Sequence, residues 1–136
     1  MYEYFDHTAD LGIRVRAADR ETLFIEAAQA MLAAVVEDLS TIRPECEIVV
    51  TIEGDDPDYL LFDWLSELLV RLDTEHLVFG RFEVQFTDTG LIGKAVGESL
   101  DRNRHDPEHE IKAITYHGLL VEQTEDGWLA EVIVDI

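Results

Sequence analysis

Two carboxylates, an imidazole and a hydroxyl lie together near the N-terminus, in the run from Asp6 to Asp10 (Asp-His-Thr-Ala-Asp). Carboxylate oxygens are the ligands that hard cations such as Ca²⁺ and Mg²⁺ prefer. The same residue types are also typical of a polar turn, in which short side chains cap neighbouring backbone groups. Spacing alone favours the polar turn and leaves a cation site as the sharper alternative.

A second group of anions is expected at the C-terminal end, where residues 128–136 alternate as a strand does. A terminal carboxylate on Ile136 would lie close to the side chain of Asp135, and two adjacent anions are unfavourable unless a cation lies beside them. If this strand pairs with the first one, Asp10 joins them and the three groups form an all-oxygen cation site. Taken alone, the segment is better explained as a solvated strand end whose charges have no role.

The stretch from Ser99 to Glu110 is polar and forms the one long loop that the sequence predicts. Long loops in compact domains are often functional. His105 and His109 have the spacing of two zinc ligands on one helix face, but Pro107 between them disfavours a helix there. Lys112, one of two lysines, follows the loop and could pair with a carboxylate, contact an anionic ligand or lie along the surface.

Several enzymatic patterns are absent from the sequence. It has no phosphate-binding glycine loop and no GxSxG nucleophile motif. Its one cysteine, Cys46, excludes an intrachain disulfide and a zinc cluster of several thiolates.

Two amphipathic helices and a set of strands must position these groups. Residues 23–36 and 60–72 repeat apolar side chains at helical spacing, after the N-cap candidates Asp19 and Asp56. Each helix has an apolar stripe and a charged back face, as helices that lie on a sheet do. Alternation with period two predicts the strands, which are residues 12–17, 47–53, 82–86, 91–98, 116–124 and 128–135.

The order of these elements predicts an α+β fold in a single domain, residues 1–136. In it, two helices pack on one face of a largely antiparallel sheet.

The charge balance narrows the classes of partner. The 136 residues include 10 Lys and Arg against 30 Asp and Glu, for a net charge of −20, while 47% are hydrophobic. That hydrophobic fraction supports a real core rather than a disordered acidic tail. The negative charge disfavours binding to nucleic acid and to anionic membranes. It suits a basic protein partner, a bound cation or a high-salt cytoplasm. With no signal peptide or membrane span in the sequence, we expect a cytoplasmic protein.

Taken together, the motifs resemble the archease family over essentially the whole chain. The matching runs are Asp6–Gly12, Gly97-Glu98 with Asp101 and His105, Ile111–His117, and Val134–Ile136. The resemblance implies an SHS2-like archease fold and an accessory protein rather than an enzyme. Such a protein activates an RtcB-type tRNA-splicing RNA ligase by promoting guanylylation of the ligase and its multiple turnover.

The resemblance also implies a divalent cation, calcium first with magnesium or manganese as alternatives. Its ligands would be Asp10, Asp135 and Ile136, and the family's motif lysine falls on Lys112. Further partner or activation contacts are expected from the remaining motif residues, which are Asp6, His7 and His105. The family motif opens with Asp or Glu, so the identity of Asp6 is the least constrained of these.

Two other functions stay open at the level of sequence. One is a stand-alone metal-dependent hydrolase that uses Asp10 with His7 or His105. The other is a nucleic-acid-binding module, which the charge disfavours. The expected partner is the ligase, with no direct contact to nucleic acid or membrane, and the sequence indicates no oligomeric state.

Overall fold

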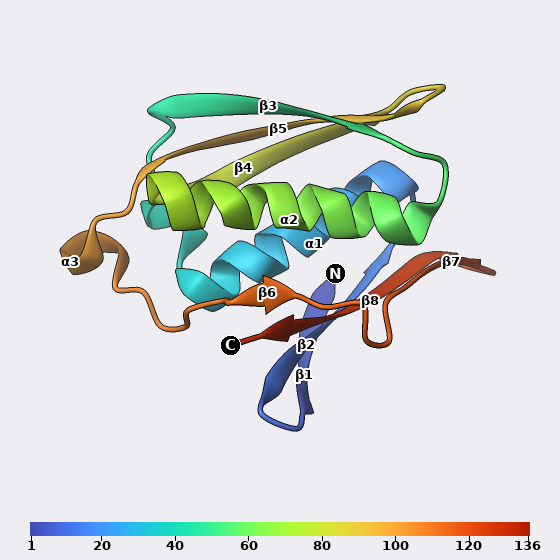
Figure 1. Cartoon of the computed structure of the whole chain (residues 1–136), viewed down its shortest axis with the longest axis horizontal. Helices are drawn as coiled ribbons and strands as arrows, with labels where there is room; N and C mark the ends of the chain where they lie inside the picture. The colour runs from blue at the N-terminus through green and yellow to red at the C-terminus, as the bar shows by residue number, and fades with distance from the viewer.

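Eight strands form two separate antiparallel sheets, with the two long helices between them (Figure 1). The computed structural model describes all residues from Met1 to Ile136. The larger sheet has the order β1-β2-β8-β6, and β7 pairs with the same edge of β8 as β6 does. Its strands are β1 (Tyr2–His7), β2 (Asp10–Ala17), β6 (Ala113–Ile114), β7 (Leu120–Thr124) and β8 (Gly127–Asp135). The smaller sheet has the order β3-β5-β4, with β3 (Cys46–Glu53), β4 (Leu77–Phe86) and β5 (Gly90–Ser99).

Both long helices begin where the sequence predicts. In α1 (Arg20–Val35), the Asp19 side chain accepts a hydrogen bond from the Thr22 N–H at 2.7 Å. In α2 (Pro57–Glu75), the Asp56 side chain accepts from the Asp58 N–H at 3.0 Å, and proline occupies the first turn, where its missing N–H has no helical partner to lose. Two short helices complete the chain, η1 (Leu39–Thr41) and α3 (Arg102–His105).

The helix α1 differs from the expected single apolar stripe, because it is buried on most of its sides. It packs on β2 and β8 of the larger sheet and on β4 of the smaller one. Its small residues let both sheets approach, and Ala27, Ala28 and Ala30 have no exposed surface. Trp64 of α2 is also fully buried, and its indole N–H donates to the Phe24 carbonyl of α1 at 3.1 Å.

The α+β class and the antiparallel strands are confirmed, and the structure adds two features. The strands divide into two sheets that cover the helices from both sides, instead of one sheet that carries both helices on one face. Residues 2–7 form a strand, β1, that the sequence pattern did not predict. No helix combines the length and the apolarity that crossing a membrane requires.

Candidate functional site

Pairing of β2 with β8 brings the start of β2 next to the end of β8. In this antiparallel ladder Asp10 lies opposite Asp135, Leu11 opposite Val134, and the pairing continues to Ala17 and Trp128. The sequence left this pairing open as a condition; the structure meets it, and β2 begins at Asp10 rather than at Gly12. Directly opposite residues have Cβ atoms about 5 Å apart on one face, so two carboxylates share this corner and Ile136 follows at once. We call Asp10, Asp135 and Ile136 the acidic corner.

The turn between β1 and β2 fixes His7 next to Asp10. Thr8 and Ala9 both have positive φ, 21° and 68°, as a two-residue hairpin turn requires. These conformations are unfavourable for residues with a Cβ, and such strain is concentrated at functional sites. The turn leaves His7 Nδ1 3.7 Å from Asp10 Oδ2, with no hydrogen-bond partner of its own. The His7 ring also packs on His117, with 4.9 Å between ring centroids.

Lys112 adjoins the acidic corner through its backbone. Its N–H donates to the Asp135 carbonyl at 2.7 Å, and the next residue, Ala113, lies opposite Asp135 in the ladder of β6 and β8. Its side chain is exposed and belongs to none of the ion pairs of the chain. The ammonium group is thus free to meet an anion from another molecule.

The acidic corner has the chemistry of a hard-cation site in part. Asp10 and Asp135 pair with no lysine or arginine, and the Asp10 side chain is 29% exposed, so its oxygens are open to a ligand. No group of three or more His, Cys, Asp or Glu side chains lies close enough to hold a metal ion. The oxygen donors therefore suit Ca²⁺ or Mg²⁺ in kind, and a third protein ligand has to come from the main chain at Ile136. The cation site remains a prediction.

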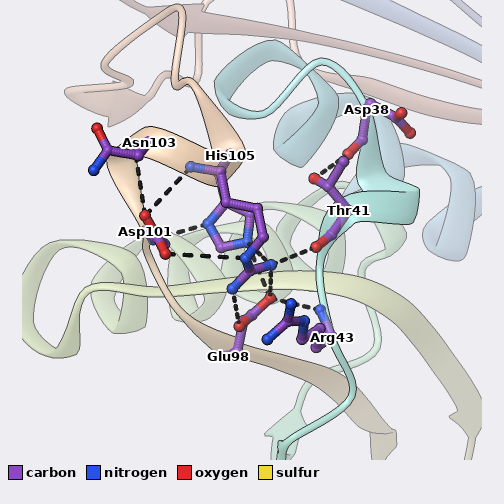
Figure 2. Close-up of polar contacts among 8 residues, drawn as sticks. Asp38, Thr41, Arg43, Glu98, Asp101, Asn103 and His105 are labelled. Atoms are coloured by element: carbon purple, nitrogen blue, oxygen red, sulfur yellow. Dashed lines mark hydrogen bonds and ion pairs between the residues drawn. The ribbon is translucent and has the colours of Figure 1, made fainter.

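A second polar cluster lies at the end of β5, around the buried Glu98 (Figure 2). Arg104 donates two hydrogen bonds to this carboxylate, from Nη2 to Oε1 at 2.6 Å and from Nη1 to Oε2 at 2.7 Å. The Arg43 N–H donates to Oε2 at 2.6 Å. These contacts, the guanidinium first, hold the pKa of Glu98 well below its usual range, although burial acts in the opposite direction.

His105 is the last member of this cluster, and its side chain is fully buried. Its Nδ1 accepts from the Asp101 N–H at 2.9 Å, and its Nε2 lies 3.0 Å from Glu98 Oε2. An imidazole that accepts at Nδ1 carries its proton on Nε2, so His105 donates to Glu98. Asp101 meanwhile caps α3 through the N–H groups of Asn103 and Arg104.

The structure therefore separates the predicted site residues into two places. His7 and Lys112 lie at the acidic corner, while His105 lies inside the Glu98 cluster and acts on the loop that leads to Lys112. Both ring nitrogens of His105 are in use, so it offers none to a zinc ion shared with His109. Asp6 lies on β1, opposite Leu11, and is exposed.

Sequence reasoning missed four participants. Glu98 and His117 stand inside the motif runs, but nothing in their spacing indicates a buried ion pair or a ring contact with His7. The roles of Arg104 and of the Arg43 backbone depend on contacts across 6 and 55 positions of the chain, which periodicity does not reveal.

Comparison with known proteins gives one consistent result. The model of the archease protein family (MTH1598/TM1083) matches residues 2–136. The chain is 41% identical to the protein archease of Pyrococcus furiosus over 141 aligned positions, covering 100% of this chain and 99% of that protein. It is 39% identical to the protein archease of Methanopyrus kandleri, covering 99% of each. The solution structure of protein 1598 from Methanobacterium thermoautotrophicum superposes with a TM-score of 0.81 at 34% identity, over 99% of this chain and 98% of that one.

Proposed function

Because the chain belongs to the archease family, we propose that it is an accessory protein of an RtcB-type tRNA-splicing RNA ligase. In this role it promotes guanylylation of the ligase and sustains multiple turnover, without catalysing a reaction of its own. The observation that supports the proposal most directly is the pairing of Asp10 with Asp135 beside the unpaired Lys112.

In the proposed mechanism, Asp10, Asp135 and a main-chain oxygen of Ile136 hold one divalent cation, calcium or else magnesium or manganese. A bound cation would supply positive charge where the carboxylates of Asp10 and Asp135 otherwise repel each other. The ladder of β2 and β8 keeps the two aspartates in register, and the strained turn at Thr8 and Ala9 keeps His7 beside Asp10.

Lys112 has a separate part in this mechanism. Its ammonium is exposed and unpaired, so it can donate hydrogen bonds to a phosphate of the nucleotide or to a carboxylate of the ligase. The Glu98 cluster acts at a distance, because it fixes the segment from Asp101 to His105 from which the chain runs to Lys112.

The first experiment measures multiple-turnover RNA ligation with Asp10→Ala and Asp135→Ala. We expect each variant to lose most of the stimulation, on the order of tenfold or more, because each removes a charged ligand. Calcium should raise the melting temperature of the wild type and leave that of the variants unchanged. Asp88→Ala, an exposed carboxylate in the turn between β4 and β5, is the matched control. Full stimulation by folded Asp10 and Asp135 variants would contradict the cation site.

The second experiment separates Lys112 from the cation. Lys112→Ala should lower ligase stimulation by about tenfold, while the rise in melting temperature with calcium stays as in the wild type.

Incubation of the protein alone with GTP or RNA tests the hydrolase alternative, in which Asp10 would work with His7. Turnover without the ligase would favour that alternative.

A further inference from the structure

Three aromatic rings from two elements form an exposed surface next to the acidic corner. Tyr116, in the segment between β6 and β7, stacks on Phe62 of α2 with 4.0 Å between centroids and 12° between planes. Tyr59, one helical turn before Phe62, meets Tyr116 edge-on at 5.8 Å. Tyr116 is 59% exposed and Tyr59 is 55% exposed. We call Tyr59, Phe62 and Tyr116 the aromatic ledge.

Hydrogen bonds fix the backbone segments that carry the ledge, although the rings are exposed. The Thr115 N–H and hydroxyl both donate to the Ile133 carbonyl, at 3.0 and 2.9 Å, and the Leu119 N–H closes the turn on the Tyr116 carbonyl at 3.2 Å. Asp58 at the start of α2 accepts from the Val121 N–H at 2.6 Å, which ties the helix to β7. In Figure 1 the segment between β6 and β7 passes beside the N-terminal half of α2. Rings that are already ordered lose little entropy when a partner covers them.

The charge on the two segments that form the ledge is mostly negative, and Lys112 lies just outside them at the acidic corner. Residues 44–70 and 113–136 contain no lysine and no arginine. The exposed carboxylates close in sequence to Tyr59 and Phe62 include Asp55, Asp56 and Asp63. Exposed aromatic faces on acidic segments suit an arginine guanidinium, which stacks on the ring and pairs with the acid. The same charge opposes the phosphates of RNA, although exposed aromatic rings are otherwise a platform for bases.

The ledge is continuous with the acidic corner. His117 follows Tyr116 directly and packs on His7, which in turn contacts Asp10. A partner that reaches the acidic corner from this side therefore also covers the ledge.

We infer that the aromatic ledge is the docking surface for an arginine-bearing, cationic segment of the partner protein. The inference rests on the proposed function in one respect, since that function identifies the partner as the RNA ligase. In the complex, a guanidinium lies on the exposed face of Tyr116 or Tyr59, and the carboxylates beside the ledge balance its charge.

The test measures the affinity of the ligase for the full-length chain by calorimetry, at low and at physiological salt. Tyr116→Ala should raise Kd by about tenfold and Tyr59→Ala by about fivefold, as for aromatic residues at the centre of an interface. Tyr116→Phe should restore nearly full affinity, because the ring face and not the hydroxyl makes the contact. Asp63→Asn should weaken binding and reduce its dependence on salt. Val49→Ala, which shortens a 54% exposed side chain on β3 of the other sheet, is the matched control and should stay within twofold.

A second measurement does not involve the ligase. N-acetyl-arginine amide, but not its lysine counterpart, should shift the NMR signals of the Tyr59 and Tyr116 rings in the wild type. A short RNA oligonucleotide should leave those signals in place, and signal shifts by RNA would assign the ledge to nucleic acid and overturn the inference.

The outcomes separate the two proposals. If the wild type binds and stimulates the ligase while the tyrosine variants bind equally well, the docking surface is wrong and the proposed function stands. If the wild type neither binds nor stimulates the ligase, the proposed function fails, and the ligase is overturned as the occupant of the ledge.

Discussion

Glu98 and Asp10 are carboxylates in opposite surroundings. Glu98 is 4% exposed and receives two hydrogen bonds from Arg104, one from the Arg43 backbone and one from His105. Asp10 has no cationic partner except His7 at 3.7 Å, and that contact is ionic only when the imidazole is protonated. At the residue scale, one carboxylate is therefore satisfied within the chain, while the other is left available for a ligand.

The satisfied carboxylate makes folding stability depend on pH. The pKa of Glu98 is lower in the folded chain than in the unfolded one. The ionised carboxylate therefore stabilises the fold fully at pH values above the pKa of the unfolded chain, about 4.3, and this stabilisation is lost as the pH falls towards the pKa of the folded chain. Glu98→Gln should lower the free energy of unfolding by about 2 kcal/mol near pH 7. The difference from the wild type should shrink below about pH 4. Urea unfolding across pH measures this, with Asp88→Asn as control, and an unchanged difference down to about pH 3 would contradict the assignment.

At the scale of elements, the helices and most strands were predictable because local rules define them. Asp19 and Asp56 are N-caps in the structure as in the sequence, and the alternation of residues 128–135 is β8. The same alternation, with the motif resemblance, was enough to anticipate that Asp10 and Asp135 meet.

Other features depend on contacts that local patterns do not encode. The division into two sheets follows from how α1 is covered on both sides, and its alanines suit either a sheet on one side or sheets on two. Residues 116–119 were expected to be part of a strand, but they form a turn that Thr115 fixes, and the aromatic ledge depends on that turn. The contacts among Glu98, Arg104 and His105 were likewise not predictable from the spacing of these residues in the sequence.

The packing of α2 on the smaller sheet depends on one position without a side chain. A Cβ on Gly93 of β5 would lie 2.4 Å from the ring of the fully buried Trp64. Gly93→Ala should therefore lower the free energy of unfolding by about 1–3 kcal/mol, the range for overpacked cores. Urea unfolding measures the loss. Lys94→Ala, the outward-facing neighbour on the same strand, is the control, since it removes only an exposed ion pair with Glu83. Equal losses for both variants would show that the contact with Trp64 carries no special weight.

At the scale of the whole molecule, most carboxylates have no cationic partner, because 30 acidic residues face only 10 lysines and arginines. Some of them are forced together. The Glu108 carboxyl group, with Asp38 and Asp106 nearby, raises the pKa of Glu37. The folded state thus contains repulsion that extended chains largely avoid, and the cationic ligands that we propose for the acidic corner and the aromatic ledge would reduce it.

This repulsion predicts that salt stabilises the fold. Raising NaCl from about 0.05 M to about 1 M shortens the screening length from over 10 Å to about 3 Å. Repulsion across the surface then weakens, while the buried core and the Glu98 pair are little affected, so the melting temperature should rise by several degrees. Calorimetry in NaCl and in KCl should give the same rise, because screening does not depend on the identity of the cation. The double variant Glu37→Gln with Glu108→Gln should melt higher than the wild type at low salt and gain less from added salt. A chain that unfolds at low salt would indicate adaptation to a high-salt environment, whereas a melting temperature independent of salt would show that the net charge of −20 is spread too widely to affect folding.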